Sequence, residues 1–185
     1  MKLIPNLLSA ARLALAPYLF MVLWRREYTL ALGLILIAGI TDGLDGLLAR
    51  KLRAASRLGA YLDPIADKVL LSGSFLTLAL DGAIEKWLAV LVFGRDALIL
   101  LLAGGAFAFT SVRKFPPSIW GKASTTAQIA FVVAVLGHFA GVVPMSWVEM
   151  GKWIVAGLAV WSGLHYVWIA ISAIVWPPMN ADKRR

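Results

Sequence analysis

The sequence has no cysteine and little charge. The absence of cysteine excludes disulfides and thiolate metal sites. Only 15% of the residues are charged and 61% are hydrophobic, whereas a soluble domain carries about 25% charged residues. The chain also lacks a recognisable polar linker, an internal repeat and a low-complexity stretch. We therefore expect residues 1–185 to form a single integral membrane domain of the all-α class.

The excess of positive charge has two possible meanings. A net charge of +8 could indicate a nucleic-acid partner, but the basic residues are scattered through the loops without an aromatic-interleaved basic face. We therefore expect no nucleic-acid partner, and we read the charge as a signal of membrane orientation.

Apolar segments close to the length of a membrane span follow one another along the whole chain. A helix needs about 20 residues to cross the hydrocarbon core. The sequence predicts six transmembrane helices, at about Leu7–Trp24, Leu30–Leu48, Ala60–Leu80, Trp87–Phe109, Ala123–Val143 and Trp147–Trp176. Tryptophans near the ends of these segments are typical of the membrane interface.

The positive-inside rule orients these segments. With the N-terminus in the cytoplasm, the cytoplasmic side receives Lys2, Arg50, Lys51, Arg53, Arg57, Arg113, Lys114, Lys122, Lys183, Arg184 and Arg185. The other side receives only Arg25, Arg26, Lys86 and Lys152. We therefore expect both termini, and the loop between the second and third segments, on the cytoplasmic face.

Four aspartates flank that loop, namely Asp42, Asp45, Asp63 and Asp67, out of ten acidic residues in the chain. A lone carboxylate at the centre of a membrane helix costs about 2.5–3.5 kcal/mol. Spacings of three and four residues place each pair on one helix face. Clustered carboxylates suit hard divalent ions such as Mg²⁺ or Mn²⁺. The sequence therefore predicts a metal site at a membrane surface.

The residues around the aspartates favour a phosphate ligand. Gly46, Ala49 and Gly59 are small enough to let a backbone or a flat ligand approach closely, and Arg50 adds positive charge. Pro64 leaves two structures open, because it either occupies the first turn of the third helix or lies inside a helix that began earlier.

Together these residues form a pattern that is identified with a known family. The chain contains the pattern Asp42-x-x-Asp45-Gly46-x-x-Ala49-Arg50, then eight residues, and then Gly59-x-x-x-Asp63-x-x-x-Asp67. This pattern resembles the signature of the CDP-alcohol phosphatidyltransferases. The resemblance implies six transmembrane helices, a homodimer in a bacterial-type inner membrane, and a cytoplasmic site with two divalent cations. It implies transfer of a phosphatidyl group from CDP-diacylglycerol to an alcohol, with release of CMP.

The resemblance also implies roles for individual residues. Asp42, Asp45 and Asp63 would be metal ligands, and Asp67 would be the general base, also near a metal. The nucleotide site would consist of Asp42, Gly46, Ala49, Arg50 and Gly59.

Two acceptor alcohols remain open, phosphatidylglycerol and glycerol 3-phosphate. Enzymes that use glycerol 3-phosphate usually carry a further arginine after a block that resembles Gly94-Arg95-Asp96, and here no basic residue follows until Arg113. Ser162-x-x-His165-Tyr166 also resembles the cardiolipin-making members, whereas Gly121-Lys122-x-x-Thr125-x-x-Gln128 fits the other type better. We expect phosphatidylglycerol as the acceptor, bound near Arg12, Arg95 and Lys122.

A non-enzymatic alternative uses the same aspartates, as a cation transporter or a metal-binding membrane scaffold. A transporter is expected to carry its acids at mid-membrane within an internal repeat, and this chain has neither feature. The two histidines, His138 and His165, are read as hydrogen-bonding residues between helices, although His165 could also line the site.

Overall fold

The structure is a computed structural model, and the residues it describes form six α-helices. It describes the backbone of residues 3–52, 57–109 and 118–175, and the side chains of residues 11, 13–41, 68–102, 104–105 and 118–172. The helices are α1 (Leu3–Trp24), α2 (Tyr28–Leu52), α3 (Arg57–Asp81), α4 (Lys86–Phe109), α5 (Ile119–Phe139) and α6 (Met145–Val175). Even the shortest, with 21 residues, is about 30 Å long at 1.5 Å per residue.

The second and third helices continue beyond the apolar segments that the sequence predicts. Hydropathy places their facing ends at Leu48 and Ala60, whereas α2 ends at Leu52 and α3 begins at Arg57. The added residues are mostly Ala, Leu, Arg and Lys, which favour helix without being apolar enough to lie in a bilayer. Because α3 begins at Arg57, Pro64 lies inside this helix, in agreement with the second of the two alternatives.

The fifth helix lies about four residues earlier in the sequence than predicted. Its N-cap is Ser118, whose side chain accepts a hydrogen bond from the Trp120 backbone N–H. Its C-terminus closes with Gly141 at φ 77°, while the Val142 N–H donates to the Gly137 carbonyl and the Gly141 N–H donates to the His138 carbonyl. This pair of hydrogen bonds is a Schellman motif, in which glycine adopts the left-handed conformation at no steric cost.

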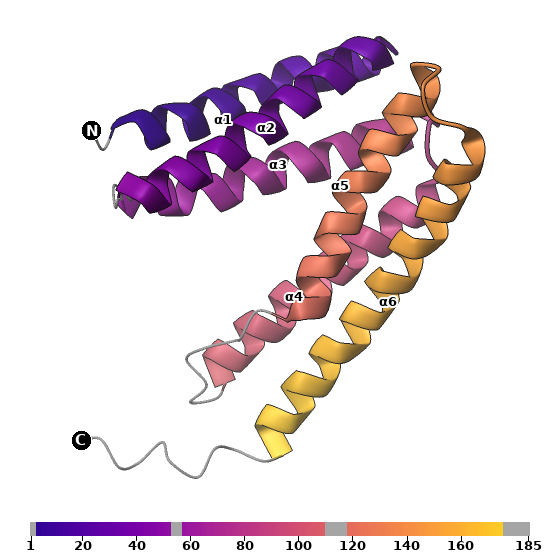
Figure 1. Cartoon of the computed structure of the whole chain (residues 1–185). Coiled ribbons are helices and arrows are strands. Elements are labelled where there is room, and N and C mark those ends of the chain that lie inside the picture. The colour runs from indigo at the N-terminus through magenta and orange to yellow at the C-terminus, as the bar shows by residue number, and fades with distance from the viewer. Residues whose placement is uncertain (1–2, 53–56, 110–117, 176–185) are drawn as a thin grey trace.

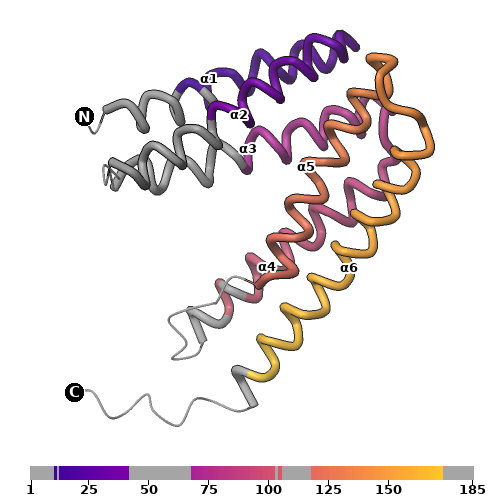
Figure 2. Tube along the Cα trace, in the orientation of Figure 1, coloured from indigo at the N-terminus to yellow at the C-terminus, as the bar shows by residue number. Residues whose placement is uncertain are grey.

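The six helices form two groups of three, α1–α3 and α4–α6 (Figure 1). Within them, α1 packs on α2 and α3, and α6 packs on α4 and α5; between them, α2 contacts α5, and α3 contacts α4 and α5. The turns after α1, α3 and α5 lie together at one end, which we call the turn end. The two groups diverge from there, as the coloured parts of Figure 2 show, toward the opposite end, where α1 begins and α6 ends in Figure 1. We call this opposite end the open end.

The core holds the two groups together and draws on all six helices. Its largest fully buried side chains include Leu19 and Leu23 of α1, Phe75 of α3 and Leu136 of α5. The rings of Phe75 and Phe131 lie 5.9 Å apart across the boundary between the groups. The core therefore joins the two groups through apolar contact.

Ion pairs close the turn end. Arg26 Nε lies 2.8 Å from Asp81 Oδ1, and Lys152 Nζ lies 2.8 Å from Glu85 Oε1. The hydrogen bond from Lys152 lowers the pKa of the Glu85 carboxyl group below its usual value. These contacts tie the connections between helices to the helices themselves.

The outer surface is strongly apolar. Val90, Leu100 and Trp168 are each about 70% exposed. Trp24, Trp87 and Trp147 are also exposed, and all three lie at helix ends on the turn end, as expected of residues at a membrane interface. Among the described residues, the segments Ile119–Phe139 and Met145–Ser172 are long and apolar enough to cross a bilayer. The count of six spans stays a prediction.

Candidate active site

The aspartate motif lies on two consecutive helices whose backbone places the two pairs at matching depth. Asp42 lies ten positions before the end of α2 and Asp67 lies ten positions after the start of α3, which is about 15 Å along each helix. Asp45 and Asp63 lie seven and six positions from the same ends, or about 10 Å. Only residues 53–56 separate the two helices. The motif therefore lies two to three turns inside the helices at the open end, deeper than the segment ends to which the sequence assigned it.

The side chains of this motif lie outside the described residues, and the same is true of Gly46, Ala49, Arg50 and Gly59. Their metal-binding, nucleotide-binding and catalytic roles stay predictions. The chemistry of the donor set fits the two expected cations, because four carboxylates are ligands that Mg²⁺ and Mn²⁺ prefer. Positions three and four apart on continuous helices also share a face, as that site requires.

A chain of polar contacts begins one residue after Asp67. Lys68 Nζ lies 2.5 Å from Asp96 Oδ2, and the other oxygen of Asp96 accepts a hydrogen bond from Arg95 Nη1 at 2.7 Å. Nη2 and Nε of Arg95 donate to Ser162 Oγ at 2.7 and 3.2 Å. We call Lys68, Asp96, Arg95 and Ser162 the polar relay; it connects α3, α4 and α6. Arg95 and Ser162 are buried, so each requires the partners that it has.

A second set of hydrogen bonds fixes the start of α5 against α6. The Ser118 backbone N–H donates to the Tyr166 hydroxyl at 3.0 Å, and Ser118 Oγ lies 3.1 Å from His165 Nδ1. Gly121 packs beneath this contact, because a Cβ built there would lie 3.0 Å from the Tyr166 hydroxyl and 3.3 Å from Arg95 Nη2. A side chain at position 121 would therefore press on both Tyr166 and Arg95.

A wide, open cavity of about 530 Å³ lies beside these contacts, and we call it the polar cavity after the charged and hydroxyl-bearing residues on its lining. Two residues expected to bind the acceptor, Arg95 and Lys122, line it together, with hydroxyl groups from Ser118, Thr125, Thr126 and Tyr166. Lys122 is exposed and forms no ion pair with a described residue, whereas Arg95 already faces Asp96. The side chain of Arg12, the third residue expected to bind the acceptor, is outside the described set.

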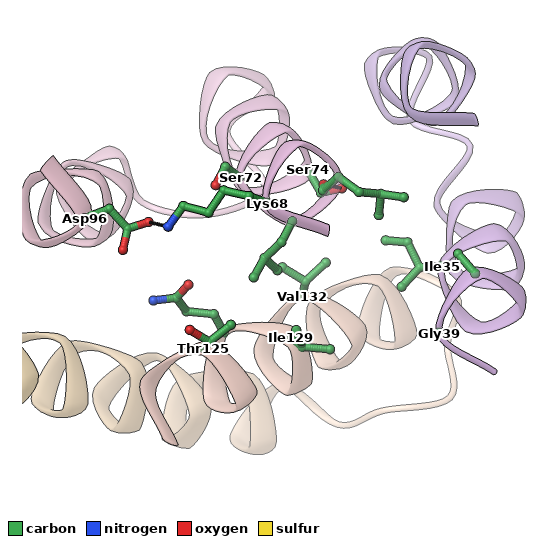
Figure 3. A pocket seen from close by; sticks show the side chains of 13 residues that line it. Ile35, Gly39, Lys68, Ser72, Ser74, Asp96, Thr125, Ile129 and Val132 are labelled. Atoms are coloured by element: carbon green, nitrogen blue, oxygen red, sulfur yellow. Dashed lines mark hydrogen bonds and ion pairs between the residues drawn. The ribbon is translucent and has the colours of Figure 1, made fainter. Parts of the chain in front are cut away.

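A second cavity of about 300 Å³ is lined by residues of α2, α3, α4 and α5 (Figure 3). Lys68 and Asp96 line its polar end, and Ile35, Ile129 and Val132 contribute to its apolar wall. Thr125 borders both cavities. The two cavities therefore adjoin each other, one with Arg95 and Lys122 on its lining and the other with Lys68 and Asp96.

Three sequence blocks far apart in the chain meet here. Arg95-Asp96, the Gly121–Gln128 block and the Ser162–Tyr166 block all contribute to the polar relay or to the cavities. Sequence reasoning missed Ser118, although a serine after two prolines is a typical helix N-cap signal. His138 lies away from these residues and contacts the Val143 carbonyl at 3.0 Å, a structural contact within the α5–α6 turn.

Comparison with known proteins identifies the family. The family model for CDP-alcohol phosphatidyltransferase matches residues 2–175. A Pseudomonas fluorescens CDP-diacylglycerol–glycerol-3-phosphate 3-phosphatidyltransferase is 30% identical over 98% of this chain and 94% of its own length. A Streptomyces coelicolor cardiolipin synthase (CMP-forming) is 31% identical over 97% and 87%.

Other relatives are longer. A probable cardiolipin synthase (CMP-forming) of Drosophila melanogaster is 36% identical over 64% of this chain, which spans only 36% of that protein. The relatives carry the names of both acceptor types, so they do not resolve the acceptor. Members of an enzyme family also give no support to the alternative of a cation transporter or scaffold. The match over residues 2–175 shows that this chain, whose described elements are all helices, belongs to the membrane-associated CDP-alcohol phosphatidyltransferase family.

Proposed function

We propose that this protein transfers a phosphatidyl group from CDP-diacylglycerol to the hydroxyl group of phosphatidylglycerol, forming cardiolipin and CMP. The observation that carries the reaction class is the eight-residue signature across α2 and α3, with its two aspartate pairs at matching depth on consecutive helices. The proposal extends to two divalent cations held by Asp42, Asp45, Asp63 and Asp67. When bound, they would supply charge neutralisation for the diphosphate.

In the proposed reaction, the acceptor hydroxyl oxygen forms a bond to the phosphorus of the phosphatidyl group as the bond from that phosphorus to the CMP oxygen breaks. Asp67 takes the hydroxyl proton, and CMP leaves with the electron pair of the broken bond. An aspartate of ordinary pKa near 4 is a weak base at neutral pH, so we infer that proton transfer accompanies the attack on phosphorus. Arg50 and the small residues Gly46, Ala49 and Gly59 are proposed to accept the nucleotide.

The polar cavity supports phosphatidylglycerol as the acceptor. Of the two cations that line it, Arg95 is engaged by Asp96 and Ser162, which leaves Lys122 as the described cation without a carboxylate partner. One uncompensated positive charge matches the single charge of a phosphodiester better than the dianion of a phosphate monoester. The apolar stretch of α4 after Asp96 adds no further cation.

Glycerol 3-phosphate is the second candidate. The Pseudomonas fluorescens relative named for this acceptor aligns with 98% of the chain, and the Gly121-Lys122 block fits that type. A small phosphate monoester would need additional positive charge, which Arg12 could supply from α1.

We further propose that the enzyme is a homodimer in a bacterial-type inner membrane, with the open end and both termini in the cytoplasm. The eleven basic residues that the sequence assigns to this side support the orientation.

Purified protein in vesicles, incubated with CDP-diacylglycerol, Mg²⁺ or Mn²⁺ and one acceptor at a time, tests the acceptor by mass spectrometry of the lipids. We expect cardiolipin from phosphatidylglycerol and little product from glycerol 3-phosphate. Abundant phosphatidylglycerophosphate without cardiolipin would show that glycerol 3-phosphate is the acceptor, and would leave the reaction class intact.

A further inference from the structure

The Lys68–Asp96 pair has a special place among the ion pairs of the described residues. The others are Arg26–Asp81 within the first helix group, Arg95–Asp96 on α4, and Lys152 with Glu85 and Glu149 near the turn end. Of the described pairs, Lys68–Asp96 alone joins a helix of the α1–α3 group to a helix of the α4–α6 group. Figure 3 shows the two side chains meeting across the space between α3 and α4.

The α4 side of this pair is rigidly held. Asp96 is about one-tenth exposed, and its second oxygen is fixed by Arg95. Arg95 is in turn held by the buried Ser162 of α6 and packed against Gly121 of α5. Asp96 therefore presents its free oxygen to Lys68 from a position that three helices define.

The α3 side of the pair carries the catalytic segment. Lys68 directly follows Asp67 in the sequence. Its side chain is more than half exposed, and the ion pair with Asp96 is the contact that the structure gives for its ammonium group. We propose that Lys68 and Asp96 are positioning residues, which hold the Asp67 segment of α3 at a fixed distance from the acceptor cavity of α4–α6. This inference rests on the proposed function, because it takes Asp67 as the base and the polar cavity as the acceptor site.

The fold explains why the distance between the two helix groups needs a contact of this kind to set it. The two helix groups diverge toward the open end, and the apolar core extends along α3 only as far as Leu70, beyond which Lys68 makes the described contact with α4. Transfer between two substrates held by different groups is sensitive to that separation, since an error of about 1 Å can cost a factor of about 10² in rate. An ion pair of this kind contributes little to global stability but can select one separation.

Variants of Lys68 test the proposal without disturbing the Arg95–Asp96 pair. Lys68→Met keeps much of the side-chain length and removes the charge, and we expect kcat to fall about tenfold or more while the KM for CDP-diacylglycerol changes less than about twofold. Lys68→Arg keeps the ion pair and should retain most of the turnover. Lys152→Met breaks the ion pairs at the turn end and should leave kcat unchanged per folded molecule.

A double-mutant cycle adds a second criterion. If Lys68 and Asp96 act as a unit, Lys68→Met should cost little further turnover in an Asp96→Asn background. Additive losses, or equal losses in Lys68→Met and Lys68→Arg, would overturn the proposal.

A distance measurement separates this proposal from the proposed reaction. The chain has no cysteine, so nitroxide labels can be placed specifically at Leu13→Cys on α1 and Leu101→Cys on α4, both of which are exposed. The distance between the labels is measured by double electron–electron resonance in vesicles. Lys68→Met should broaden the distance distribution or shift it to longer distances, whereas Lys68→Arg and Lys152→Met should reproduce the parent distribution. An unchanged distribution in Lys68→Met contradicts the positioning role. A changed distribution in a protein that makes no phospholipid would instead refute the proposed function alone.

Discussion

Asp67 is proposed to accept the proton of the acceptor hydroxyl group, a role that requires a carboxylate. Asp67→Asn keeps the shape and one oxygen of the side chain but removes its ability to accept the proton. We expect CDP-diacylglycerol still to bind, because the three other proposed metal ligands remain, and turnover to fall by a factor of about 10² or more. Single-turnover CMP formation and a separate binding measurement check the two halves of this prediction.

The matched control for Asp67 is Asp81, at the other end of the same helix. Asp81 accepts hydrogen bonds from Arg26 and Tyr28. Asp81→Asn should lower thermal stability and leave turnover per folded molecule unchanged. Near-parental turnover in Asp67→Asn would remove the general-base assignment.

Lys122 is the second residue with a specific expected effect, because it brings an unpaired charge to the polar cavity. A charge-assisted hydrogen bond to phosphate contributes about 1.5–3 kcal/mol, so Lys122→Gln should raise the KM for the acceptor about tenfold or more. The KM for CDP-diacylglycerol should stay the same, and Lys122→Arg should be close to the parent. Equal changes in both KM values would argue against an acceptor site in this cavity.

Among the elements, α1 and α3 pack closely at Gly73. A Cβ built on this residue would lie 2.0 Å from Cζ of Phe20. Gly73→Ala therefore forces the Phe20 ring to move, and such overpacking costs about 1–3 kcal/mol. Gly33→Ala on α2 meets nothing within 4 Å and should stabilise its helix by about 0.5–1 kcal/mol. Thermal unfolding in detergent micelles should therefore rank Gly33→Ala above the parent and Gly73→Ala below it; the reverse order would contradict this packing.

The ends of the elements explain where sequence reasoning succeeded and where it fell short. Apolar runs predicted all six helices, because burial in lipid or in a core requires such runs. They misplaced the ends of α2 and α3, since Ala, Arg and Lys extend a helix without being apolar. They misplaced α5 because Ser118 and Gly141, which cap it, carry no hydropathy signal.

Some features of the candidate site could likewise be predicted from the sequence, and others could not. The eight-residue signature could be recognised in the sequence because its residues lie within a segment of 26 positions, from Asp42 to Asp67. Arg95 and Lys122 were expected near the acceptor, and the structure places both on one cavity. The partners of Arg95 could not be derived from spacing, because Ser162 lies 67 residues away and meets it only through the packing of α4 on α6. The pairing of Lys68 with Asp96 likewise depends on how α3 crosses α4.

At the scale of the whole molecule, the diverging helix groups and the apolar outer surface suit an enzyme that draws lipid substrates from the bilayer. The turn end is closed by a core and by ion pairs, whereas the open end carries the aspartate motif. Substrates that enter between helices at the open end would keep their acyl chains in lipid.

Acceptor-dependent release of CMP tests this account most directly. Protein in vesicles that contain CDP-diacylglycerol and a divalent cation should release CMP when phosphatidylglycerol is present, with one molecule of new phospholipid formed for each CMP. Omission of every acceptor should abolish the release, and Asp67→Asn should suppress it. The absence of CMP with every alcohol tested, or CMP release without any new phospholipid, would contradict the assignment of this chain as a phosphatidyltransferase.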